Sequence, residues 1–216
     1  MGEYNKTITL GDFKCSDETI QFDVKNINNI DVPNCEPKDP LIFIKNESLS
    51  KDICDKIIEK FEKDNRRVKG RMGEGKLDIS VKNTSDLLLT SFEDWFYFDK
   101  ILFENLMQSL KEYMYILKNK NIYLQGDGNL FDTGFQIQKY DQNEGHYIWH
   151  NDYSVIKSTH SIFDPSISNR YITFIWYLND VNEGGETYFI DGKVKPTTGK
   201  LLLFPATWTY LHKGDI

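Results

Sequence analysis

Between residue 122 and the end of the sequence, short apolar segments alternate with turn-forming residues, and this succession restricts the fold more than any other feature. The segments are FQIQKY (135–140), RYITFIWYLND (170–180), GGETYFID (184–191), GKLLLFPA (199–206) and TWTYLH (207–212). Each has the length and the aromatic or branched content of a β-strand, and glycine, asparagine, aspartate or proline lies at their ends or between them. Such a series predicts a β-sandwich or barrel.

Two of these segments carry further information. FQIQKY alternates, so Gln136, Gln138 and Tyr140 are expected on one face of a strand, with Phe135 and Ile137 on the other. RYITFIWYLND is apolar on both faces, as a strand enclosed in a core would be.

The first half of the chain predicts helices that cover this β-structure. LIFI (41–44) predicts a short buried strand, and SLSKDICDKIIEKFEKD a helix with Ser50 as its cap. A longer helix is expected over about 94–119, because an apolar stripe recurs there at helical spacing: Leu102, Leu106, Leu110, Tyr113 and Leu117. The basic, glycine-containing stretch within 64–86 predicts a mobile loop, and 64–86 and 153–169 are the expected substrate-facing loops.

Length and composition predict one domain. Residues 1–121 would supply N-terminal strands and supporting helices, and residues 122–216 the β-core. The net charge of −7 argues against nucleic acid as a partner, since phosphate binding relies on basic patches. Neither a signal peptide nor an apolar stretch of membrane-spanning length is found, and the three cysteines form no CxxC, so a cytoplasmic protein is expected.

The chemistry of the chain is concentrated in YIWHNDYS (147–154), where His150 and Asp152 lie two positions apart. Residues i and i+2 of a strand share a face, so both side chains can converge on one metal ion, with His212 as a distant third ligand. Two histidines and one carboxylate leave coordination positions open, which is typical of non-haem Fe(II) oxygenases rather than of closed zinc sites. An HxD pair alone is also compatible with solvated or core side chains, and His146 or His160 offers another pairing.

A wider pattern resembles a known family. The order FQIQKY, GHYIWHND, RYITFIWYLNDVNEGGETYF and VKPTTGKLLLFPATWTYLH resembles the prolyl 4-hydroxylase-like branch of the Fe(II)/2-oxoglutarate-dependent oxygenases, over roughly 122–216. The resemblance implies a mostly β fold with flanking helices, namely a double-stranded β-helix or cupin-like jelly roll. It also implies His150, Asp152 and His212 as the iron ligands.

The resemblance extends to residues around the metal. Tyr140 and Tyr177 match positions that contact 2-oxoglutarate, and Tyr147 and Arg170 match positions that face the substrate peptide. Each tyrosine also has an alternative interpretation as a core aromatic, and Arg170 as part of a surface ion pair. Gly184 and Gly185 are expected to be structural turn residues.

The implied activity is hydroxylation of a C–H bond with Fe(II), 2-oxoglutarate and O₂, which yields succinate and CO₂, with ascorbate as an accessory reductant. The expected substrate is a peptide or protein, and proline its target residue. Alternatives are hydroxylation of a free amino acid or other small molecule, and a metal-bearing jelly roll without turnover. A zinc hydrolase is a further alternative, but no extra carboxylate is placed beside the triad as a general base.

One part of the family pattern is missing. The family holds the far carboxylate of 2-oxoglutarate with an Arg or Lys on a strand beyond the distal histidine, whereas this sequence ends at Ile216, soon after His212. Lys213 is a poor substitute, because neighbouring residues of a strand face opposite ways. We therefore expect the natural chain to continue beyond Ile216 and to carry such a basic residue.

Overall fold

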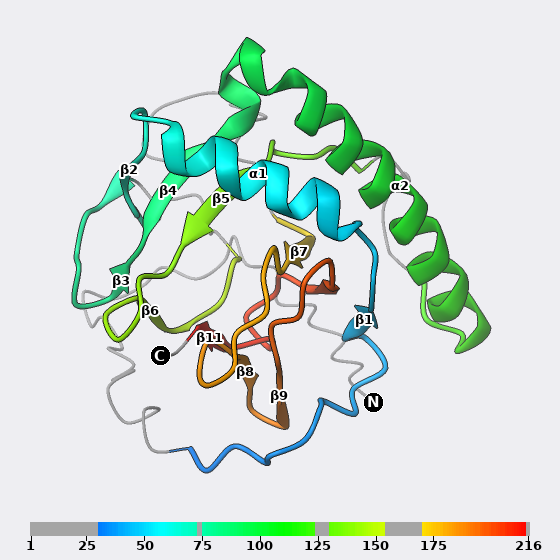
Figure 1. Ribbon diagram of the computed structural model, residues 1–216. Helices are drawn as coiled ribbons and strands as arrows, with labels where there is room; N and C mark the ends of the chain where they lie inside the picture. Colours follow the sequence, from blue (N-terminus) through cyan, green and yellow to red (C-terminus); the bar gives the residue numbers. More distant parts are fainter. Residues whose placement is uncertain (1–29, 73–74, 124–129, 154–169, 215–216) are drawn as a thin grey trace, which may run out of the picture. The chain divides into compact units, whose positions relative to one another are not determined.

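The computed structural model describes residues 30–72, 75–123, 130–153 and 170–214 (Figure 1). From Asp31 onward these residues belong to one compact unit, Asp31–Ile216. None of the helices in these ranges has the length and apolar character needed to cross a membrane. A single domain over 1–216 includes residues outside these ranges and stays a prediction.

Helix α1, Lys51–Lys63, begins where the sequence predicts. Ser50 is its N-cap, and the Ser50 hydroxyl accepts a 3.4 Å hydrogen bond from the backbone N–H of Ile53. Cys54, Ile57 and Phe61 are buried on one face. Because these residues recur every three or four positions, the helix has a single apolar side to bury.

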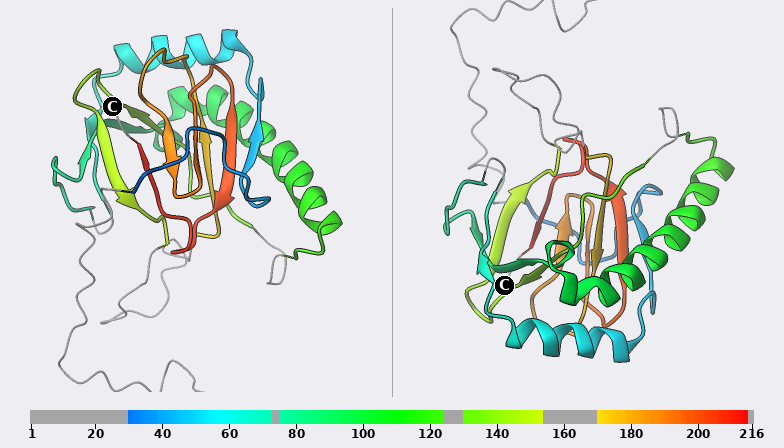
Figure 2. Two further views of the ribbon diagram at one scale, coloured as in Figure 1. Left: turned by 90° about the horizontal axis from the view of Figure 1, so that it is seen from below. Right: turned by 90° about the horizontal axis from the view of Figure 1, so that it is seen from above.

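Helix α2, Phe96–Asn119, also follows the predicted range. A 3-10 turn, Glu93–Trp95, leads into it. Four residues of the predicted stripe are buried, namely Leu102, Leu106, Tyr113 and Leu117. The fifth, Leu110, is half-buried. Both helices lie outside the strands, as the two views of Figure 2 show.

Short antiparallel strands form three sheets within the described ranges. The orders are β3-β6-β11-β8-β9, β1-β10-β7 and β2-β4-β5. The strands are β1 Phe43–Lys45, β2 Val68–Lys69, β3 Lys82–Asn83, β4 Ser85–Leu88, β5 Gln136–Lys139, β6 His146–His150, β7 Ile172–Trp176, β8 Thr187–Phe189, β9 Gly192–Val194, β10 Leu201–Pro205 and β11 His212–Gly214.

Strand β10 separates two hydrophobic clusters. Leu201 and Leu203 join the cluster that contains the buried faces of α1 and α2, whereas Leu202 and Phe204 pack with residues of β8 and β9. All four side chains are fully buried, and successive residues of a strand point to opposite faces. The apolar run LLLF is therefore explained by a strand with a helical layer on one side and the five-stranded sheet on the other.

The turn between β7 and β8 uses the two expected glycines. Gly184 and Gly185 have φ values of 75° and 72°, a region that other residues rarely adopt. The alternation of FQIQKY is also confirmed, since Phe135 is buried while Gln136 and Gln138 are exposed.

Three local predictions are wrong. The strand predicted at 41–44 lies at Phe43–Lys45 and is only half-buried, because it forms an edge that pairs with β10 alone. Within 64–86, the expected loop, the chain forms β2 and β3 and enters β4. TWTYLH is mostly turn, and its strand begins only at His212. Residues 154–169 of the other expected loop lie outside the described residues.

Candidate metal centre

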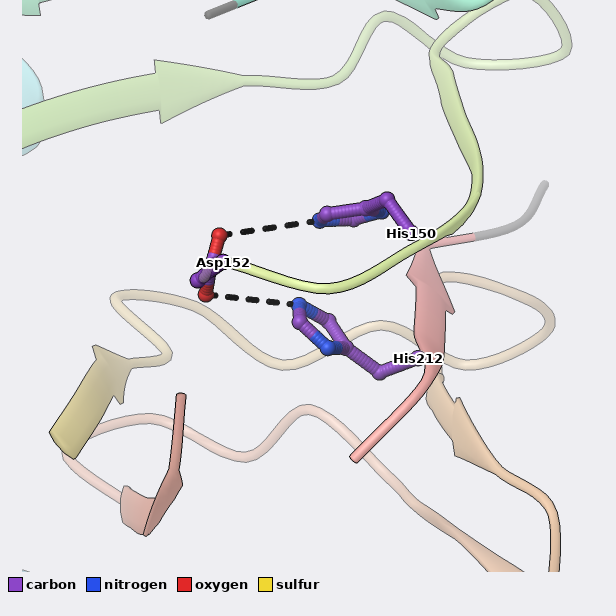
Figure 3. Close-up of side chains that lie close together, drawn as sticks. All are labelled: His150, Asp152 and His212. Atoms are coloured by element: carbon purple, nitrogen blue, oxygen red, sulfur yellow. Dashed lines mark ion pairs between the residues drawn. The ribbon is translucent and has the colours of Figure 1, made fainter. Parts of the chain in front are cut away.

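Three side chains from two neighbouring strands meet at one end of the five-stranded sheet (Figure 3). His150 is the last residue of β6, and Asp152 follows it two positions later. His212 is the first residue of β11 and lies directly opposite His150 in the antiparallel ladder. The strand register therefore brings together the two histidines, which are far apart in sequence.

The ligand atoms of the three side chains lie within 4.8 Å of one another. Nε2 of His150 is 4.0 Å from Oδ1 of Asp152, and Nε2 of His212 is 3.6 Å from Oδ2. Figure 3 shows both imidazole rings directed at the carboxylate. The three side chains are between 5% and 16% exposed, so the cluster is largely shielded but not closed to solvent.

The second ring nitrogen of each histidine is occupied by a backbone carbonyl. Nδ1 of His150 lies 2.7 Å from the carbonyl oxygen of Ile148, and Nδ1 of His212 lies 3.1 Å from that of Tyr210. Nδ1 must carry the proton in these bonds, which leaves the Nε2 lone pair free in a neutral ring. This arrangement selects the tautomer that a metal ligand needs.

The charges of the cluster suit a cation. Burial lowers the pKa of His150 to about 3 and also lowers the pKa of His212, so both rings are neutral at pH 7. Burial alone would raise the pKa of Asp152, but His212, His150 and a hydrogen bond from Thr173 hold it below its usual value. Two neutral imidazoles and one carboxylate thus form a donor set that fits a divalent metal ion.

The spacing also fits an ion bound on one face. Ligands about 2.1 Å from a metal and at right angles to one another are about 3 Å apart. The two histidine–carboxylate separations of 3.6 and 4.0 Å would each close by about 1 Å or less around an ion, and no pair of ligand atoms is more than 4.8 Å apart. Three residues on one side of the ion would leave further positions for other ligands.

Tyr140 follows β5 and lies close to this cluster. The residue is 40% exposed, and its partial burial raises the pKa of its hydroxyl; the groups whose charges act on it include Asp86, Tyr147 and Asp152. Its ring packs on β11, where a Cβ at Gly214 would contact the hydroxyl at 3.3 Å. The hydroxyl donates a weak 3.4 Å bond to Gln138 Oε1.

Tyr177 lies deeper, directly after β7. Its hydroxyl donates a 2.7 Å hydrogen bond to Oγ1 of Thr187 on β8, and burial raises its pKa. Tyr177 is one of the groups whose charge acts on Tyr140.

Arg170 and Tyr147 contact members of the cluster directly. Nη1 of Arg170 is 3.6 Å from Oδ1 of Asp152, although 58% of the Arg170 side chain is exposed. The Tyr147 ring stacks on the His150 ring, with centroids 3.4 Å apart and an angle of 15°. Of the four predicted residues around the metal ligands, Tyr147 and Arg170 contact the cluster directly, whereas the bonds found for Tyr140 and Tyr177 are to Gln138 and Thr187.

Some residues of this region were not anticipated from the sequence. Thr173 donates a 2.6 Å hydrogen bond to Oδ2 of Asp152, and a threonine within the apolar run ITFIW was the available signal. Lys82 and Asp86 form a buried ion pair beside Tyr147, in a stretch that was predicted to be a loop. Lys213 lies over the rings of Tyr188 and Trp149, away from the cluster.

An open depression of about 790 Å³ lies elsewhere, at the end of α1. It is lined by charged residues that include Lys60, Arg66 and Asp94. Lys60 and Arg66 both pair with Asp94, so its charges are compensated within the protein. It contains no member of the metal cluster.

Comparison with known proteins agrees with the geometry. The model of the 2OG-Fe(II) oxygenase superfamily matches residues 135–215, a range that contains all three residues of the cluster. No curated protein matches the chain.

Solved prolyl hydroxylases share the fold. A prolyl hydroxylase from Trichoplax adhaerens, in complex with a hypoxia inducible factor oxygen degradation domain peptide fragment, superposes with a TM-score of 0.58 at 15% identity, over 82% of this chain and 78% of that chain. A Pseudomonas putida prolyl-4-hydroxylase gives 0.53 at 12% identity, over 82% and 85%. The predicted mostly β jelly roll with flanking helices is confirmed.

Proposed function

We propose that this chain, whose residues 135–215 match the 2OG-Fe(II) oxygenase superfamily, hydroxylates proline residues of a peptide or protein substrate at C4. The observation that carries the proposal is the convergence of His150 Nε2, His212 Nε2 and the Asp152 carboxylate, with both Nδ1 atoms already bonded. These three residues would hold Fe(II). Bound Fe(II) supplies the activation of O₂ that couples decarboxylation of 2-oxoglutarate, to succinate and CO₂, with hydroxylation of a C–H bond.

Asp152 has a second role in this scheme. Its charge compensates that of the cation, and its bond from Thr173 holds one oxygen in a fixed direction. The neutral histidines add no charge, so the site retains positive charge when the metal is bound. That charge favours the binding of an anionic co-substrate beside the metal.

Tyr140 and Tyr177 are the proposed partners of the 2-oxoglutarate carboxylates. Tyr140 makes only a weak bond at present, so its hydroxyl is free to turn toward an anion. Tyr177 already donates to Thr187, but hydroxyl protons rotate. If Thr187 donates to Tyr177 instead, the phenol can donate to the co-substrate. Hydrogen bonds to a charged group contribute about 1.5–3 kcal/mol each.

Arg170 and Tyr147 are the proposed contacts of the prime substrate. Arg170 is largely exposed but remains within 3.6 Å of Asp152, which places a five-donor group at the edge of the metal centre. A peptide presents backbone carbonyls to such donors. The Trichoplax adhaerens neighbour, solved with a peptide fragment, supports a peptide over a free amino acid.

The test is a measurement of succinate formation with Fe(II), 2-oxoglutarate and O₂, with and without ascorbate. Proline-containing peptides are compared with free amino acids, and the peptide product is sequenced by mass spectrometry. We expect peptide-stimulated succinate and a hydroxyl group on proline. Stimulation by free amino acids alone would contradict the peptide substrate.

Matched variants separate the metal centre from general damage. His150→Ala and His212→Ala should abolish succinate formation while the fold persists. His146→Ala, at the start of the same strand β6, should retain it, because its Nδ1 contacts only the carbonyl of Glu144 among the bonds found. Wild-type turnover in both of the first two variants would refute the metal centre.

A further inference from the structure

Strand β6 contains an irregularity next to the metal cluster. His212 lies opposite His150, but Gly214 lies opposite Tyr147, so the two residues 148–149 of β6 face the single residue Lys213 of β11. This is the pattern of a β-bulge. In a regular strand, residues three apart point to opposite faces. The bulge instead brings Tyr147 and His150 to the same side.

The consequence is a close ring stack. The Tyr147 and His150 rings lie 3.4 Å apart at 15°, nearly parallel. The His150 ring also contacts His212, at 4.2 Å between centroids, the carbonyl of Ile148 and the carboxylate of Asp152. Tyr147 therefore covers one face of the imidazole and restricts rotation about its side-chain bonds.

Tyr147 is itself held by a buried cation. Lys82 of β3 is the direct cross-strand partner of Tyr147, and its ammonium lies 5.3 Å from the ring centroid. Lys82 is 3% exposed and pairs at 2.7 Å with Asp86, which is 1% exposed. Such a contact with a desolvated ammonium is stronger than one at an exposed site.

Neighbouring residues hold the Lys82–Asp86 ion pair in place. Thr84 donates a 2.7 Å hydrogen bond to Asp86 Oδ1, and Gln136 donates one of 3.1 Å to Oδ2. Gly70 covers the pair so closely that a Cβ there would clash with Thr84 Oγ1 and approach Lys82 Cε to 3.0 Å. The ammonium thus has little freedom to leave the Tyr147 ring.

We infer that Tyr147 and Lys82 are positioning residues for His150: the phenol ring fixes the plane of the imidazole, and the buried Lys82–Asp86 pair fixes the phenol ring. The inference rests on the proposed role of His150 as a metal ligand. In this role Tyr147 orients His150 through its ring and does not need its hydroxyl. The role is separate from the proposed contact of Tyr147 with substrate. Groups that orient metal ligands typically change metal affinity 10- to 100-fold when they are lost.

The experiment uses Co(II) as a probe, titrated into the metal-free chain and followed by its visible absorption. Tyr147→Phe keeps the ring and should bind Co(II) within about 3-fold of wild type, with an unchanged spectrum. Tyr147→Leu removes the stack and should bind about 10- to 100-fold more weakly with an altered spectrum. Thermal melting of each variant shows that the fold is retained. Wild-type affinity and spectrum in Tyr147→Leu would overturn the role of Tyr147.

Lys82 needs a paired substitution, because Lys82→Met alone would leave Asp86 buried without a partner. Lys82→Met/Asp86→Asn removes both charges and keeps an acceptor for Thr84 and Gln136. We expect Co(II) binding to weaken about 3- to 10-fold, the range of a cation–π contact. Unchanged binding would overturn the role of Lys82.

His150→Ala distinguishes a failure of the metal centre from a failure of the positioning residues. If wild type binds Co(II) and His150→Ala does not, the metal centre stands and the variants above test the positioning residues. If His150→Ala binds as wild type does, the metal centre itself is refuted, and the inference with it.

Discussion

Thr173 Oγ1 donates a 2.6 Å hydrogen bond to Oδ2 of Asp152 and so connects the sheet of β7 to the end of β6, which belongs to the other sheet. The same oxygen lies 3.6 Å from Nε2 of His212. One carboxylate oxygen is therefore oriented by a donor that belongs to neither histidine-bearing strand. The metal centre depends on how the two sheets are packed as well as on β6 and β11.

Replacing Thr173 by valine should weaken metal binding about 10-fold, as loss of a group that orients a ligand typically does. The hydroxyl lowers the pKa of Asp152, so its removal should raise that pKa and shift metal uptake to higher pH. Calorimetric titration at several pH values measures both effects. Thr197→Val, at an exposed position between β9 and β10, is the matched control. Equal affinities in the two variants would contradict the role of Thr173.

The pKa of His150 predicts how the stability of the metal-free chain depends on pH. Its value is lowered mainly by burial, to about 3, whereas an unfolded histidine has a pKa of about 6.5. At pH values between these two pKa values, the unfolded chain binds a proton at this histidine that the native state does not bind. This contribution to stability is therefore complete above about pH 6.5 and is lost as the pH falls toward 3.

The variant His150→Leu removes this titration. The free energy of unfolding should then fall less steeply between about pH 6.5 and 4, with a difference in slope of at most about 1.4 kcal/mol per pH unit. Urea unfolding in the presence of a chelator measures the slope. Identical slopes in wild type and His150→Leu would show that His150 takes up its proton in the native state.

The sequence was sufficient for the parts of the fold that rest on periodicity. The stripe Leu102, Leu106, Tyr113 and Leu117 predicted α2, and the alternation in FQIQKY predicted β5. The spacing of His150 and Asp152 predicted that they would meet. These features are local or follow from strand geometry, so one sequence contains them.

What the sequence could not supply depends on pairing between distant strands. β2 and β3 are two residues each and have no periodic pattern, yet β3 places Lys82 against Tyr147. The bulge in β6 is visible only from the register with β11. TWTYLH has aromatic and branched residues typical of a strand, but it forms a turn before His212, since tertiary context overrides propensity.

Tyr140→Phe should raise the concentration of 2-oxoglutarate needed for half-maximal succinate formation about 10-fold or more, because it removes a hydrogen bond to a charged group. Metal affinity should change little, since Tyr140 is not one of the three clustered ligands. Tyr113→Phe is the control, because the Tyr113 hydroxyl bonds to the carbonyl of Leu41 in the helical cluster. An unchanged 2-oxoglutarate requirement in Tyr140→Phe would show that the Tyr140 hydroxyl does not bind the co-substrate.

Arg170→Ala tests the substrate side of the centre. With 58% of its side chain exposed, the 3.6 Å contact of Arg170 with Asp152 is screened by solvent, so its loss should cost little stability. Peptide-stimulated turnover should drop about 10-fold or more, as expected when a charged donor to the peptide is lost. Uncoupled decarboxylation of 2-oxoglutarate should stay near the wild-type rate. Arg170→Lys keeps the positive charge but not the planar guanidinium. Peptide-stimulated turnover between that of wild type and Arg170→Ala would indicate that the charge contributes. If Arg170→Ala lowered both activities equally, Arg170 would instead support Asp152 or the co-substrate.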